Sequence, residues 1–456
     1  MLRCLARRLP RASCCLSRWQ LRLDQNDRFP LASIVPRALH FPSQTIRRDM
    51  ATSTTASHSE PIEEETLPDY DAEHFYPIHI GDTLNARYSV LGKLGYGITS
   101  TVWLCRDLKN SAYVALKVYI RTSPDQANRE ETVNRHLSGL RTSHPGCFNI
   151  RQSLDDFYLQ RANGFRHYCI VHEPLHTTMF QFQRLHGTAR PLPEGLVKDS
   201  MQCLLQGLDF LHTEASVVHC GSLHRAIRVY RRSDFFTDIK LSNIMLQIMD
   251  KSVLAAFEEE EKTDPTSRKV IDTERTIYQS RKLKHPERHA FGLPLLCDFG
   301  EARVGSRFHY EEIQPEVYKA PEILLQMEWD HMVDIWNAAC VAWDMIQAQH
   351  LFDGYDEGYH NNRVHLGEMV GLLGHPPQEF LHLSINSSRV FDSEGKWKAN
   401  PPLSPDSLED RLTQLTGDSK TQFLAFVRSM LQWQPEKRRT ARQLLEDPWL
   451  TSIEES

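Results

Sequence analysis

The sequence predicts an α+β fold of two lobes, a β-rich N-terminal lobe followed by a helical C-terminal lobe. Short runs of β-forming residues, separated by turns that contain Gly or Asn, lie at residues 88–91, 100–105 and 113–118. Apolar residues at helical spacing lie further along the chain, at 196–214, 423–431 and 441–445. The first pattern predicts a strand meander and the second a mainly helical unit, so the two lobes follow each other in sequence.

The 456-residue chain begins with an Arg-rich leader. Residues 1–49 contain ten Arg, no Lys and three acidic residues, which is typical of a mitochondrial transit peptide. Met50 offers a second start, and an optional or wrongly assigned extension explains the leader equally well. The leader carries a charge of +7, so the net charge of −6 leaves −13 for residues 50–456. This acidic body favours basic partners and disfavours nucleic acid.

Residues 50–75 are polar and acidic, with three consecutive glutamates at 63–65, and predict a disordered linker. The two lobes are then expected at 76–172 and 173–452. The second lobe contains two expected inserts, one at 220–236 and one at about 246–292 that has little core-forming pattern. The ten Cys lack CxxC pairs and metal-ligand spacing, which fits reduced thiols, and no apolar run reaches about 18 residues, so a membrane span is not expected.

A glycine-containing turn joins the first two expected strands. It consists of Gly95, Tyr96 and Gly97, followed by Ser100 and Val102. Glycines here let backbone N–H groups approach phosphates closely, although such pairs also make plain hairpin turns.

The next strand matches the kinase strand whose Lys holds the α- and β-phosphates of ATP. Ala115 and Lys117 occupy this strand, twenty residues after the turn. A following helix should supply a carboxylate that orients Lys117. Glu130 is preferred because Val133 then continues an inward helical face, and Glu131 remains the alternative.

A β-run ending at His172 leads into the expected hinge between the lobes. Here the carbonyl of Glu173 would accept a hydrogen bond from adenine and the N–H of Leu175 would donate one. His172 takes the gatekeeper position, where a packed, hydrogen-bonded histidine without a catalytic role is the favoured interpretation.

Two further motifs carry the expected chemistry. In Thr-Asp-Ile-Lys-Leu-Ser-Asn, Asp238 would accept the proton of the substrate hydroxyl, Lys240 would stabilise the charge on the γ-phosphoryl, and Asn243 would bind Mg²⁺. Asp298, in Asp-Phe-Gly, would bridge the metal and the nucleotide. Together with Ala-Pro-Glu at 320–322, the ordered motifs predict the two-lobed protein kinase fold with ATP and Mg²⁺ as cofactors.

Two acidic residues are expected to serve the scaffold. Glu322 should form a buried ion pair, for which Arg439 is the preferred partner. Asp334 lies on an expected helix, where its carboxylate can bind backbone N–H groups of the catalytic loop.

From about residue 76 to 450 the chain resembles the SR-protein kinase family, on the motifs at 95–104, 171–175, 237–243, 275–281, 297–303 and 313–322. The resemblance implies a Ser/Thr kinase that phosphorylates basic Arg/Ser-rich splicing proteins in the nucleus and cytoplasm. Thr237, in place of the usual Arg before the catalytic Asp, implies activity that does not depend on activation-loop phosphorylation. The chain departs from the family at His172, His176 and Lys319. A monomer without membrane or direct nucleic-acid contacts is expected, and a mitochondrial location is the alternative.

Seventeen residues, 220–236, interrupt the catalytic loop between His219 and Thr237. Their removal restores an unbroken loop, and seventeen codons preserve the reading frame, which favours an intron-retention or gene-assignment artefact. If the segment is genuine, a misplacement of about 1 Å can cost roughly 100-fold in rate, and a pseudokinase scaffold becomes the alternative function.

Overall fold

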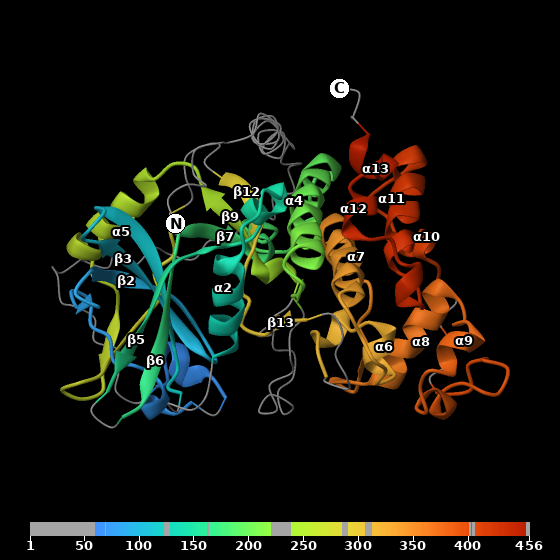
Figure 1. The fold of residues 1–456 in the computed structure, drawn as a ribbon, viewed down its shortest axis with the longest axis horizontal. Helices are drawn as coiled ribbons and strands as arrows, with labels where there is room; N and C mark the ends of the chain where they lie inside the picture. Colours follow the sequence, from blue (N-terminus) through green and yellow to red (C-terminus); the bar gives the residue numbers. More distant parts are fainter. Residues whose placement is uncertain are drawn as a thin grey trace, which may run out of the picture.

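The computed structural model describes residues 60–68, 70–122, 128–161, 164–219, 239–284, 291–305, 312–400, 403 and 406–452. These residues form a β-rich lobe and a helical lobe side by side, so the predicted α+β fold class is confirmed (Figure 1). The leader at 1–49 and the interruption at 220–236 lie outside the described residues.

The N-lobe is built on a six-stranded antiparallel sheet with the strand order β1-β2-β3-β4-β6-β5. Its strands are β1 Thr83–Leu84, β2 Tyr88–Gly97, β3 Ser100–Asp107, β4 Ala112–Tyr119, β5 Ser153–Gln160 and β6 Arg166–His172. The helix α2, Arg129–Gly139, begins at Asn128, whose side chain accepts a hydrogen bond from the N–H of Glu131. The sheet therefore supplies Lys117 and α2 supplies its expected carboxylate partner.

The C-lobe begins with a three-stranded sheet beneath the hinge, in the order β12-β9-β7. These strands are β7 Leu175–Thr178, β9 Ile244–Ile248 and β12 Phe291–Leu296. Two short strand pairs also lie in this lobe: β8 Val217–Val218 with β13 Arg303–Val304, and β14 Tyr355–Asp356 with β15 Tyr359–His360.

Helices form most of the C-lobe: α3 Met179–Phe182, α4 Glu194–Thr213, α6 Pro321–Leu324, α7 Met332–Gln347, α8 Asn362–Leu373, α9 Gln378–Leu381, α10 Leu408–Arg411, α11 Gly417–Met430, α12 Ala441–Leu444 and α13 Pro448–Thr451. Short 3-10 turns occur at η1 Glu63–Thr66, η2 Ala72–His74, η3 Pro145–Asn149, η5 Leu241–Asn243, η6 Glu316–Tyr318, η7 Ser387–Arg389 and η8 Pro435–Lys437. The helix α7 is apolar around most of its circumference because it lies in the centre of the lobe, between α4 and α11 (Figure 1). No helix among the described residues is long and apolar enough to cross a membrane.

The second insert differs from its prediction, because much of it packs as core on the N-lobe. It contains α5 Ser252–Thr263, β10 Arg268–Val270 and β11 Thr276–Tyr278. The helix α5 lies against β2 and β3, where Val253, Leu254 and Phe257 form a small core with Leu104 (Figure 1). Gly92 makes room for this contact, since a Cβ atom there would lie 2.7 Å from the Phe257 ring. The apolar pattern of α5 finds its partners about 150 residues earlier in the chain, so local sequence does not reveal them.

The predicted disordered linker at 50–75 is wrong for residues 60–68 and 70–75, which are ordered on the N-lobe. The three glutamates of η1 bind donors from distant segments. Lys93 forms ion pairs with Glu64 and, at 3.4 Å, with Glu63, and Lys269 binds Glu65 at 3.0 Å. An acidic run that appears solvated in the sequence is thus neutralised by buried lysines, one of them from the second insert.

The predicted partner of Glu322 is also wrong by one residue. Arg438, not Arg439, forms the buried ion pair. Its Nη1 and Nη2 lie 2.7 Å from Oε1 and Oε2 of Glu322, respectively. The backbone turn at η8 directs Arg438 inward, where its guanidinium also donates to the carbonyl of Met332. Arg439, which is partly exposed, instead pairs with Asp447.

Candidate active site

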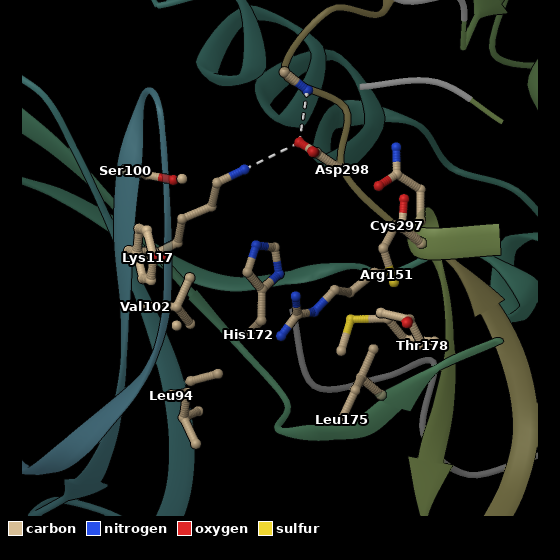
Figure 2. Close-up of a pocket in the computed structure, with 18 of the residues that line it drawn as sticks. Leu94, Ser100, Val102, Lys117, Arg151, His172, Leu175, Thr178, Cys297 and Asp298 are labelled. Carbon is tan, nitrogen blue, oxygen red and sulfur yellow. Dashed lines mark hydrogen bonds and ion pairs between the residues drawn. The ribbon is translucent and has the colours of Figure 1, made fainter. Parts of the chain in front are cut away.

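A cleft of about 1230 Å³ lies between the lobes and collects most of the predicted site residues. The predicted site residues that line it are Gly95, Tyr96, Gly97, Ser100, Val102, Ala115, Lys117, Glu130, Leu175, Lys240, Asn243 and Asp298. Figure 2 shows Lys117, Ser100 and Val102 on the sheet side of the cleft, opposite Asp298 and Cys297. Residues predicted from six separate segments of the sequence therefore lie around one cavity.

The glycine turn forms the upper wall of the cleft. The strands β2 and β3 pair from Tyr88 to the turn itself, with Gly95 opposite Val102 and Gly97 opposite Ser100. No atom beyond their chain neighbours lies within 4 Å of a Cβ built on Gly95 or Gly97, so close packing within the protein does not require glycine there. The open space beside this backbone is suited to a ligand that approaches the N–H groups closely.

Lys117 stands between two carboxylates. Its Nζ lies 2.9 Å from Glu130 Oε2 and 3.0 Å from Asp298 Oδ1. Burial opposes the charge of Lys117, but the carboxylates of Asp298 and Glu130 outweigh it and raise the pKa of this ammonium. Lys117 therefore remains a cation at neutral pH, as a group that holds phosphates must.

The structure places Glu130 beside Lys117, as the sequence favoured, and gives Glu131 another environment. Glu131 accepts a hydrogen bond from the Tyr158 hydroxyl and forms an ion pair with Arg135. Both glutamates are buried, but only Glu130 points into the cleft. The cap at Asn128 sets this rotation of α2 by fixing its first turn.

Asp298 has the left-handed backbone conformation, with φ of 64°, that turns its carboxylate toward the cleft. The N–H of Gly300 donates to Asp298 Oδ1 at 3.4 Å. Burial acts against the charge, yet Lys117 outweighs it and lowers the pKa of Asp298. The carboxylate is therefore ionised and can serve as a metal ligand.

The segment around Asp298 is anchored from below by a buried network. The ring of Phe299 packs edge-on against His219, with centroids 4.9 Å apart, and His219 Nε2–H donates to the carbonyl of Cys297 at 3.0 Å. The backbone N–H of His219 donates to Asp334 Oδ2 at 2.9 Å, and His212 binds the same oxygen at 2.9 Å. Asp334 thus supports the backbone before the catalytic loop, as the sequence predicts.

The residues fit a divalent cation by the chemistry of their donors. The carboxylate of Asp298 and the amide oxygen of Asn243 are hard oxygen ligands, and both residues line the cleft. Mg²⁺ commonly binds one or two such protein groups together with substrate phosphates. Lys240 lines the same region, whereas Asp238 lies outside the described residues.

The hinge lies at the inner end of the cleft. Leu175 packs with Leu295 and Cys297 on the floor, and Ala115 pairs with His172 across β4 and β6. His172 is buried, and its Nδ1–H donates to the carbonyl of Gln152 at 3.0 Å. Burial and then the cation of Arg151 hold the pKa of His172 well below its usual value, so the ring is neutral and has a packing role.

The sequence did not identify Arg151 or the segment 281–283 as cleft residues. Arg151 follows η3 and lines the cleft beside His172 and Leu175 (Figure 2). Arg281, Lys282 and Leu283 come from the second insert and line the cleft mouth. The signal for Arg151 is a single cation before an alternating strand, which by itself resembles an ordinary surface residue.

The two-lobed fold and the paired Lys117, Glu130 and Asp298 define a phosphotransfer enzyme that uses a nucleoside triphosphate. The protein kinase domain family matches residues 88–257 and 283–450, and the chain belongs to this family. The unmatched residues between these segments lie in the second insert. A serine/threonine protein kinase of Aspergillus fumigatus is 42% identical over 393 residues, which covers 85% of this chain and 91% of that protein.

More distant relatives support the resemblance to SR-protein kinases. A serine/threonine-protein kinase SRPK of Physarum polycephalum is 27% identical over 415 residues, or 86% of this chain and 92% of that protein. SRSF protein kinase 3 of Mus musculus is 25% identical over 538 aligned positions, or 86% of this chain and 91% of that protein. The chain is therefore a serine/threonine protein kinase with an inserted segment, similar to SR-protein kinases.

Proposed function

We propose that this kinase transfers the γ-phosphoryl group of ATP to Ser and Thr hydroxyls of basic, Arg/Ser-rich proteins. The similarity to an SRPK and to SRSF protein kinase 3 over 86% of the chain carries this proposal. The charge of −13 over residues 50–456 also supports it, because an acidic surface attracts an Arg-rich chain.

In this proposal the residues of the cleft position the reactants. Lys117, oriented by Glu130, holds the phosphates of ATP, and Asp298 with Asn243 holds Mg²⁺. The metal supplies charge stabilisation to the transferring phosphoryl group. Lys240 adds a second cation near that group, and Asp238 accepts the proton of the substrate hydroxyl. Catalysis then rests on orientation and electrostatics.

The test compares four forms of the chain on an Arg-Ser-rich peptide: the full sequence, the 220–236 deletion, and each of these with Asp238→Ala. Peptide phosphorylation is measured with Mg²⁺ and ATP, and a peptide with Lys in place of Arg serves as the substrate control. We expect phosphorylation that needs Asp238 and prefers the Arg peptide. Equal rates on the two peptides would reject the substrate class while leaving the kinase assignment intact.

The alternative function is a pseudokinase scaffold, which the interruption at 220–236 motivates. The same assay separates the two. A deletion form that is active beside an inactive full sequence would show that the segment blocks catalysis. Inactivity of both forms, with nucleotide binding retained, would favour the scaffold.

We further propose a monomer in the nucleus and cytoplasm, with no membrane or direct nucleic-acid partner. The Arg-rich leader supports a mitochondrial location as the alternative. A reporter fused to residues 1–49 and scored for mitochondrial import distinguishes the two locations, and light scattering of the purified chain measures the oligomeric state.

A further inference from the structure

The adenine end of the cleft contains a cation that the phosphotransfer mechanism does not use. Arg151 enters the cleft from the segment between η3 and β5, and its backbone N–H donates to the carbonyl of Leu296 at 2.8 Å. This bond fixes the start of the side chain. Figure 2 shows the guanidinium beside His172 and above Leu175, at the wall that a purine base would face.

The guanidinium binds the hinge carbonyl that the base would use. Arg151 Nη2 donates to the carbonyl of Glu173 at 3.2 Å. Within the described part of the chain, Arg151 has no carboxylate at ion-pair distance, and its buried Nε–H has no hydrogen-bond partner. The cation therefore has donor capacity left for an acceptor on a ligand.

The two purine classes present opposite groups at this position. Adenine carries a 6-amino donor, and an amino group and a guanidinium cannot hydrogen-bond to each other because both only donate. A 6-oxopurine carries the O6 acceptor and an N1–H donor. Its O6 can accept from Arg151, and its N1–H can donate to the carbonyl of Glu173.

His172 has the opposite preference on the same wall. Its Nδ1–H is used by the carbonyl of Gln152, and its neutral ring leaves the other nitrogen as an acceptor. An acceptor favours the 6-amino group of adenine. The wall therefore combines one residue suited to each class of purine.

We propose that Arg151 is a base-selectivity residue that allows the cleft to bind 6-oxopurine nucleoside triphosphates, such as ITP and GTP, alongside ATP. Without the guanidinium, His172 and the hinge select adenine. Arg151 does not touch the transferring phosphoryl group in this assignment, so it affects the choice of the phosphate donor and leaves the chemical step unchanged.

The experiment measures dissociation constants for the Mg²⁺ complexes of ATP, ITP and GTP by calorimetry, with the full chain and Arg151→Leu. ITP is the decisive probe because it lacks the 2-amino group of GTP and differs from ATP only in the 6-oxo group and N1–H. Arg389→Leu, an exposed position on η7 in the C-lobe, is the matched control. Because binding is measured, the result does not depend on the protein substrate, and each comparison of ITP with ATP is made within one form of the chain.

We expect the dissociation constant of the full chain for ITP to lie within about tenfold of that for ATP. In Arg151→Leu the affinity for ITP should fall by at least about tenfold, while ATP binds equally well or more tightly. Arg389→Leu should leave the ratio unchanged. A ratio of ITP to ATP affinity that is the same in Arg151→Leu and the full chain would overturn the proposal. The proposal would also be overturned if Arg151→Leu weakened the binding of both nucleotides equally, or if the full chain did not bind ITP.

Discussion

At the scale of single residues, Lys117 connects the two lobes across the cleft. It touches Glu130 on α2 and the expected metal ligand Asp298, so one ammonium connects β4, α2 and the segment after β12. Its loss removes the cation that holds the phosphates and leaves the buried Glu130 and the partly exposed Asp298 without their shared counter-charge.

We expect Lys117→Met to reduce phosphoryl transfer by at least about 100-fold, because this cation stabilises charge on the phosphates. The rate is measured in whichever form transfers phosphate faster, the full chain or the 220–236 deletion. Lys251→Met, at an exposed position before α5, is the control. A Lys117→Met enzyme that keeps a tenth of the activity would contradict the assigned role.

The ion pair between Glu322 and Arg438 gives a second prediction. Both side chains are almost fully buried, so Glu322→Gln leaves a cation without its partner inside the C-lobe. We expect a loss of about 3–5 kcal/mol in the free energy of unfolding, measured by urea denaturation. Arg439→Gln, which removes a partly exposed pair with Asp447, should cost no more than about 1 kcal/mol. A larger loss for Arg439→Gln than for Glu322→Gln would contradict the assignment of Arg438 as the partner of Glu322.

At the scale of elements, α5 shows how the second insert stabilises the N-lobe. Phe257 is 2% exposed and fills the space over Gly92. We expect Phe257→Ala to lower the free energy of unfolding by about 3–5 kcal/mol through loss of buried surface and the cavity left behind. Glu259→Ala, on the exposed side of the same helix, should change it by less than about 0.5 kcal/mol.

The mode of unfolding provides a further check on α5. If Phe257→Ala releases the helix locally, protease cleavage within 252–284 should increase before the C-lobe unfolds. Unchanged stability together with unchanged cleavage would show that α5 does not support the sheet.

The elements also show what the sequence can and cannot predict. The strands β2 to β4 and the helix α4 follow from local periodicity, and the motifs place Lys117 and Asp298 because their spacing is fixed by the chemistry they share. The packing of α5 on Gly92 and the pairing of η1 with Lys93 depend on distant partners. Arg151 belongs to this second group, since its position in the cleft depends on a backbone bond to Leu296.

At the scale of the whole molecule, buried histidines link stability to pH. His167 is fully buried, and burial lowers its pKa to about 4, below a value of about 6.5 in an unfolded chain. Between these two values the unfolded state binds a proton that the folded state does not. The folded state therefore loses stability as the pH falls below about 6.5.

We expect this histidine to contribute about 1.4 kcal/mol per pH unit to the acid loss of stability between pH 6.5 and about 4. Urea unfolding at several pH values measures the slope for the full chain and for His167→Leu. The variant should have the shallower slope even if its absolute stability differs. Parallel slopes would contradict the contribution of His167.

The position of α5 has a consequence for how the lobes can move. The chain passes between the lobes at the hinge before β7, passes back after β9 to form α5, and returns after β11 to form β12. Two lobes joined by one backbone segment can twist around that segment. Three covalent connections between the lobes remove most of this twisting freedom. The lobes should therefore open and close about one main axis and rotate little about any other. A cut in the backbone between β11 and β12 should restore the twisting motion and leave the hinge itself intact.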